Sequence, residues 1–199
     1  MVCHKHKFIF TRVPKTASTS MIYSLFNCYP HCDDVRLDTS GYWSGDPNHY
    51  PLYAAKQVLS EDIYKKYFKF AFVRNPWDRV VSDYFYGLKW FKSDAHRKIP
   101  LPRRLSDGFE NYIFSMNDWE KKSLICQSDF TEGSDFIGRF ENLQEDFNYV
   151  CDEIENPRAK LKQLNRSDHG QYREYYNKET ERAIAEKFAK DIEYFKYEY

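Results

Sequence analysis

The sequence predicts an α/β fold with a mainly parallel central sheet flanked by helices, because strand-like and helix-like segments alternate along the chain. Three short, apolar and β-prone segments have the character of buried strands, and they span 7–11, 69–73 and 136–140. Each is followed by a segment with helical character. The chain has 199 residues, a length that suits one domain with a single core. We therefore expect a single domain over residues 1–199.

The segment between the first two strands contains a helix, an irregular stretch and a broken helix. Apolar residues recur on one helical face over 18–29, whereas 30–51 is rich in Asp, Gly, Ser and Pro and is expected to be irregular. A helix over 53–67 is expected to break near Ser60, whose hydroxyl can cap a second helical turn that begins at Glu61.

The second strand is followed by a strong helix-start signal. Asn75 can cap a helix whose first position is Pro76, and this helix is expected to run to about Phe91. The stretch 92–105 combines prolines with basic residues, so we expect a basic loop there. Further helices are expected over 106–115, 118–127, 141–154 and 178–195, the last capped by Asn177.

Composition excludes several classes of protein. Thirty basic and thirty acidic residues cancel, which argues against a general nucleic-acid binder. Five cysteines, an odd number without a repeating pattern, argue against a disulfide framework. Cys28 and Cys32 flank His31, but no second pair stands at zinc-ligand spacing, so we expect no metal site. Residues 1–12 contain no signal peptide or membrane span, and a complete chain would work in the cytoplasm.

A first anion site is predicted where the strand 7–11 leads through the loop 13–20 into a helix. Backbone N–H groups at a helix start have no intrahelical partner, and the helix dipole adds positive potential. Lys15 adds a full charge, and four residues with hydroxyl groups follow it within the loop. The loop contains no glycine and lacks the GxxxxGK[ST] pattern of an ordinary nucleotide-triphosphate loop. The alternative is a Ser/Thr-rich helix cap beside an incidental lysine.

A second phosphate site is predicted at the end of the strand 69–73. Arg74 follows this strand, and Ser82 lies eight residues further on, inside the next helix. A guanidinium and a hydroxyl can together hold a phosphate that is separate from the first. The alternative is that Arg74 pairs with a carboxylate and Ser82 faces the core.

The segments PKTASTS (14–20) and FVRNPWDRVVSDY (72–84) resemble the two nucleotide-binding signatures of sulfotransferases that use 3′-phosphoadenosine 5′-phosphosulfate (PAPS). The resemblance is to the carbohydrate, Golgi-type branch and its bacterial relatives, and the lysine loop is similar to that of uronosyl 2-O-sulfotransferases. The segments 136–147 and 172–197 also resemble the family. The resemblance implies a P-loop-like three-layer fold, PAPS as co-substrate, 3′,5′-ADP as product and no metal.

The resemblance also implies roles for individual residues. Lys15 would stabilise the leaving phosphate, the loop up to Ser20 would hold the 5′-phosphate, and Arg74 with Ser82 would hold the 3′-phosphate. A late loop over 165–173 would close on the nucleotide. The residues expected at the nucleotide are Pro14, Lys15, Thr16, Ala17, Ser18, Thr19, Ser20, Arg74, Ser82, Ser167, Tyr172 and Arg173.

A base must take the proton of the acceptor hydroxyl, and histidine is the usual choice. His49 lies in the interval where related enzymes carry a base, with Asp46, His31 and His96 as alternatives. The expected acceptor is a hydroxyl compound, with a saccharide favoured. Two other functions stay open: a nucleotide kinase or NTPase with a degenerate phosphate loop, and a nucleotide-binding module without catalysis. A kinase or NTPase would depend on magnesium, whereas a binding module would bind the nucleotide without turnover.

Overall fold

The computed structural model describes residues 1–28, 34–35, 37–93, 95–96, 98–118, 124–164 and 168–199. The chain folds into two compact units. The first comprises Met1–Arg74 and Lys122–Leu164, and the second comprises Asn75–Lys121 and Asn165–Tyr199. The single domain expected from the sequence therefore stays a prediction.

The first unit is built on a five-stranded sheet with the strand order β3-β1-β2-β4-β5. Its strands are β1 (Val2–Cys3), β2 (Phe8–Thr11), β3 (Asp34–Val35), β4 (Phe68–Val73) and β5 (Phe136–Arg139). β2, β4 and β5 are parallel, and they match the three predicted strands within one residue. β1 and β3 pair antiparallel to their neighbours, so residues 34–35 correct the expectation of irregular structure there. Neither two-residue strand is long enough to carry a periodic pattern.

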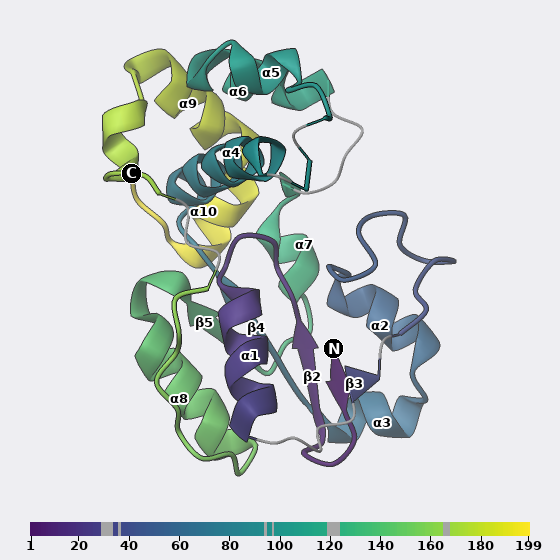
Figure 1. Cartoon of the computed structure of the whole chain (residues 1–199). Coiled ribbons are helices and arrows are strands. Elements are labelled where there is room, and N and C mark those ends of the chain that lie inside the picture. The colour runs from purple at the N-terminus through teal and green to yellow at the C-terminus, as the bar shows by residue number, and fades with distance from the viewer. Residues whose placement is uncertain (29–33, 36, 94, 97, 119–123, 165–167) are drawn as a thin grey trace. The chain divides into compact units, whose positions relative to one another are not determined.

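Helices cover both faces of this sheet, which gives the first unit three layers (Figure 1). On one face, α1 (Ser18–Cys28) and α8 (Leu143–Glu153) pack against the phenylalanines of β2 and β4. On the other face, α2 (Leu52–Val58) and α7 (Gln127–Thr131) pack against Ile9 and Ala71. The alternation follows from the two-residue period of a strand, which sends successive side chains to opposite faces.

Several predicted element boundaries are confirmed and others are corrected. The break near Ser60 is confirmed, because its Oγ accepts a hydrogen bond from Ile63 N and caps α3 (Glu61–Lys66). The helix expected over 118–127 is wrong at its end, since Ile125 and Cys126 are not helical and α7 begins at Gln127. A short 3-10 helix, η3 (Phe140–Asn142), precedes α8.

The described part of the second unit is helical. It contains α4 (Pro76–Lys92), α5 (Arg103–Ser106), α6 (Phe109–Phe114), η1 (Ser115–Asp118), η4 (Tyr172–Tyr175), α9 (Lys178–Lys187) and α10 (Ala189–Phe195). Asn75 and Asn177 both accept backbone hydrogen bonds at the helix starts predicted for them. The last predicted helix is interrupted at Phe188, and α5 lies partly within the predicted basic loop. Among the described residues, no helix is long and apolar enough to cross a membrane.

A buried ion pair and an indole hydrogen bond organise the second unit. Arg79 on α4 lies 3.7 Å from Asp191 on α10, measured between Nη1 and Oδ2, and both side chains are fully buried. The Trp77 indole donates a hydrogen bond of 3.0 Å to the Glu181 carbonyl. These contacts tie α4 to the C-terminal helices. Trp77 is itself buried and belongs to the core of this unit.

Candidate functional site

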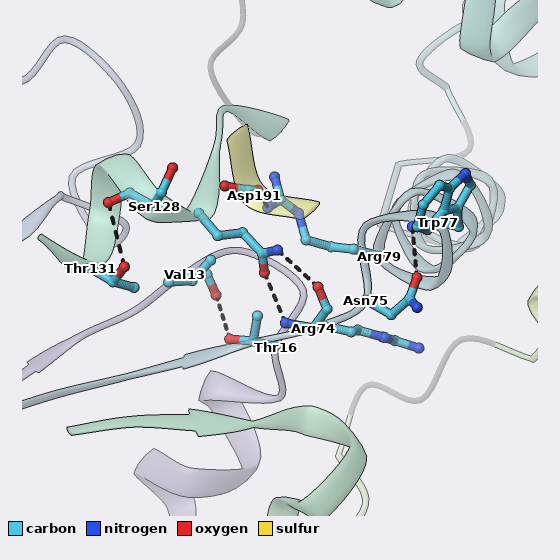
Figure 2. Close-up of polar contacts among 10 residues, drawn as sticks. Val13, Thr16, Arg74, Asn75, Trp77, Arg79, Ser128, Thr131 and Asp191 are labelled. Carbon is cyan, nitrogen blue, oxygen red and sulfur yellow. Dashed lines mark hydrogen bonds and ion pairs between the residues drawn. The ribbon is translucent and has the colours of Figure 1, made fainter. Parts of the chain in front are cut away.

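The loop between β2 and α1 has a strained backbone. Lys15 has φ of 69° and Ala17 has φ of 64°, and neither is glycine. Left-handed backbone of this kind is costly for ordinary residues and is concentrated at functional sites. The Thr16 hydroxyl donates a hydrogen bond of 2.9 Å to the Val13 carbonyl and so closes the loop on itself (Figure 2).

The loop ends at the start of α1, whose first residue is Ser18. The first N–H groups of a helix lack intrahelical acceptors, so this end of α1 can receive an anion. Ser18 and Ser20 are buried, whereas Thr19 is exposed. The Ser20 hydroxyl accepts a hydrogen bond of 3.1 Å from Leu164 N. The loop and helix start therefore have the donor set expected of a phosphate site.

Arg74 stands at the carboxyl end of β4 and reaches the same loop. Its Nη1 donates a hydrogen bond of 3.3 Å to the Lys15 carbonyl, and its guanidinium lies 3.9 Å from the centre of the Phe140 ring. Its backbone is held by Gln127 on α7, which accepts from Arg74 N at 2.9 Å and donates to Arg74 O at 2.8 Å. The side chain of Arg74 is therefore in contact with the backbone of the loop that carries Lys15.

His49 is brought to this region by an ordered loop. The His49 backbone N–H donates to the Asp46 carbonyl at 2.9 Å, and the Asp46 carboxylate accepts from Asn48 N at 2.8 Å. The Trp43 ring packs edge-on against Phe130 and donates from its indole nitrogen to the Asp46 carbonyl. This loop sets the ring of His49 against the Arg12 carbonyl, with 2.7 Å between Nδ1 and the oxygen.

The environment of His49 favours a neutral ring with a defined tautomer. Burial lowers the pKa of His49, the hydrogen bond to the Arg12 carbonyl partly opposes this, and the charges of Arg12 and Lys15 lower the pKa further. A carbonyl oxygen only accepts hydrogen bonds, so Nδ1 carries the proton. Nε2 of the neutral ring is then an acceptor.

The other predicted nucleotide residues lie in the second unit or outside the described residues. Ser82 is buried on α4, and its pairing with Arg74 on one phosphate stays a prediction. Arg173 on η4 donates to the Tyr199 carbonyl at 2.7 Å, and its guanidinium lies over the rings of Tyr172 and Tyr199. Ser167 falls outside the described residues.

The alternative bases have other contacts or cannot be described. His96 stacks on Trp90 with 3.6 Å between ring centres and contacts the Ser93 hydroxyl at 2.9 Å. The Asp46 carboxylate shapes the loop before His49. His31, with the neighbouring Cys32, lies outside the described residues. Within the described ranges, no three His, Cys, Asp or Glu side chains gather in a way that could hold a metal ion.

Two contributors to the site were missed from the sequence: Gln127 and the carbonyl of Arg12. Gln127 was expected at the end of a helix. Gln127 meets Arg74 across 53 residues, and His49 meets Arg12 across 37. No local pattern encodes such contacts, because each depends on how the strands and helices come together.

Comparison with known proteins identifies the family of this chain. A family model described as "Sulfotransferase family" matches residues 1–198. An uncharacterized protein of the archaeon Archaeoglobus fulgidus is 27% identical over 127 residues, which span 62% of this chain and 97% of that protein. The family model covers nearly the whole chain, including the lysine loop, His49 and Arg74. The chain therefore belongs to the sulfotransferase family.

Proposed function

We propose that this protein transfers the sulfuryl group of PAPS to a hydroxyl of a saccharide acceptor. One observation carries the proposal: a lysine, an arginine and a histidine with a defined tautomer converge where β2 and β4 end. In sheets with parallel strands, ligands bind beyond the carboxyl ends of the strands. The family membership supports sulfuryl transfer as the reaction class.

The donors at this end of the sheet suit a ligand with several anionic groups. Lys15 and Arg74 supply positive charge, and the start of α1 supplies backbone N–H groups. PAPS would bring a sulfuryl group on an activated phosphate, together with a 3′-phosphate. We assign the 5′-phosphosulfate to the loop that carries Lys15 and the 3′-phosphate to Arg74, with Ser82 as its predicted partner.

His49 is assigned as the general base. Its Nδ1 proton is held by the Arg12 carbonyl, so Nε2 is the atom that can accept the proton of an acceptor hydroxyl. Burial keeps the pKa of His49 below its ordinary value. The ring is consequently neutral, and competent as a base, at neutral pH.

Lys15 is assigned the role of stabilising the negative charge that develops during transfer. In-line transfer moves negative charge onto the leaving phosphate, and a fixed ammonium stabilises that charge without reorganisation. The hydrogen bond from Arg74 to the Lys15 carbonyl fixes the backbone of the loop at Lys15, whose side chain carries this ammonium. The saccharide acceptor rests on the resemblance of the loop 14–20 to that of uronosyl 2-O-sulfotransferases.

The test is transfer of label from radioactive PAPS to a panel of glycans and small alcohols, without added metal. We expect label on a saccharide with the wild-type protein and none with Lys15→Ala or His49→Ala. Lys160→Ala, an exposed lysine, and His96→Ala serve as matched controls that keep activity. Label that persists in His49→Ala and vanishes in His96→Ala would overturn the assignment of the base.

The same samples separate the two other functions. A kinase or NTPase would bind ATP with magnesium in preference to 3′,5′-ADP. A binding module would bind 3′,5′-ADP but move no label to any acceptor, and Lys15→Ala would then change affinity alone. Either result would refute the proposed transferase.

A further inference from the structure

We infer that Gln127 is a positioning residue that holds Arg74 for the 3′-phosphate and so sets the preference for nucleotides that carry this group. The inference rests on the proposed function, in which Arg74 binds the 3′-phosphate. Gln127 is the first residue of α7, and its side chain is fully buried.

The Gln127 carboxamide makes a two-point contact with the backbone of Arg74. Its Oε1 accepts from Arg74 N at 2.9 Å, and its Nε2 donates to Arg74 O at 2.8 Å. An N–H can only donate and a carbonyl can only accept, so this pair of bonds permits one orientation of the amide. The contact resembles one more rung of a sheet, made by a side chain after β4 has ended.

The two bonds fix the position from which the Arg74 side chain extends. Its guanidinium then lies over Phe140 on one side and donates to the Lys15 carbonyl. Arg74 is buried, so water cannot easily replace the two hydrogen bonds that Gln127 makes to its backbone. We call this pair of hydrogen bonds between Gln127 and the backbone of Arg74 the Gln127 clamp. Without the clamp, the peptide groups of Arg74 could rotate and displace its guanidinium. A displacement of about 1 Å at a group that binds a ligand is enough to weaken an oriented contact severely.

The Gln127 clamp acts on Arg74 rather than on the loop assigned to the 5′-phosphate. Gln127 touches the backbone of Arg74, whereas the 5′-phosphate is assigned to the loop at Lys15. Removal of the clamp should therefore weaken binding of ligands with a 3′-phosphate more than binding of ligands without one. A residue that only stabilises the fold would affect both kinds of ligand alike.

The experiment compares 3′,5′-ADP with 5′-AMP by calorimetry in Gln127→Met, Gln127→Glu and Thr131→Val. Methionine keeps the volume and loses both bonds, whereas glutamate keeps the acceptor for Arg74 N and sets a second, repelled oxygen against Arg74 O. Thr131→Val is the matched control, because it removes from the same helix a buried hydroxyl that donates to Ser128 O. Thermal unfolding of each variant reports on the fold.

We expect the wild type to prefer 3′,5′-ADP, and both Gln127 variants to lose about tenfold or more of affinity for it. Affinity for 5′-AMP should change by less than about threefold, and Thr131→Val should keep the wild-type ratio. In turnover, the KM for PAPS should rise in Gln127→Met while kcat changes little.

Three other results are informative. A wild type without preference for 3′,5′-ADP would refute the proposed function itself. A wild type with the preference, and Gln127 variants that retain it or that lose both ligands equally, would overturn only the role of Gln127. Failure of both Gln127 variants to fold, with Thr131→Val folded, would assign Gln127 to stability and would also overturn it.

Discussion

Replacing Ala17 with glycine is expected to stabilise the protein, although glycine inside a helix normally weakens it. Ala17 has φ of 64° in the loop before α1. This left-handed backbone costs an L-residue about 1–2 kcal/mol, and glycine does not pay this cost. Glycine makes the unfolded chain more flexible, which offsets about 0.4–1 kcal/mol of the gain. The expected net effect is about 0.8 kcal/mol in favour of Ala17→Gly.

Urea unfolding followed by tryptophan fluorescence measures this difference. With a slope of about 2 kcal/mol per molar urea, the midpoint should rise by about 0.4 M. The melting temperature should rise by about 2–3 °C for a chain of this length. The matched control is Ala183→Gly within α9, where φ is not positive and glycine should cost about 1 kcal/mol. A midpoint for Ala17→Gly that falls as it does for Ala183→Gly would refute the argument from strain.

Four further predictions follow from the described contacts. The kcat/KM for sulfuryl transfer should fall as pH falls, because His49 must be neutral, with a midpoint below the ordinary histidine value of 6.5; a pH–rate profile with a midpoint at or above that value contradicts the assignment. The depressed pKa of His49 also means that the unfolded chain binds its proton more readily, so its contribution to stability is lost as pH falls through 6.5 toward the folded value. Asp191→Ala should lower the free energy of unfolding by about 3–5 kcal/mol, because it leaves Arg79 buried without its counter-charge. The double variant Arg79→Met with Asp191→Leu should recover most of that loss in urea unfolding. Equal losses in the single and double variants would contradict this. Gly138→Ala on β5 should cost about 1–3 kcal/mol in the same assay, because a Cβ there would overlap the Phe72 ring, and an unchanged midpoint would show that the ring can move away.

Local patterns predicted the parts of the site that lie next to strands. The loop with Lys15 follows β2, and Arg74 with the Asn75 cap follows β4, so strand ends and helix starts could both be found in the sequence. The confirmed break at Ser60 has the same origin, since a capping side chain acts within its own turn.

Contacts between distant segments could not be predicted in this way. The clamp of Gln127 depends on where α7 begins, and the pattern over 118–127 placed a helix end at that residue. The tautomer of His49 depends on the Arg12 carbonyl, which is brought there by the loop anchored at Trp43. A backbone acceptor has no sequence signature, because every residue has one.

The parallel register of β2 and β4 restricts how the chain can change in length. Phe10 pairs with Phe70 and Thr11 with Ala71, so β4 runs two residues beyond the end of β2 before it reaches Arg74. Adding or deleting a single residue between Phe70 and Arg74 would turn every later side chain of β4 to the opposite face. The guanidinium would then leave Phe140 and the Lys15 carbonyl in one step, even in a folded sheet. We therefore expect natural length variation to spare this stretch and to accumulate in the connections between helices.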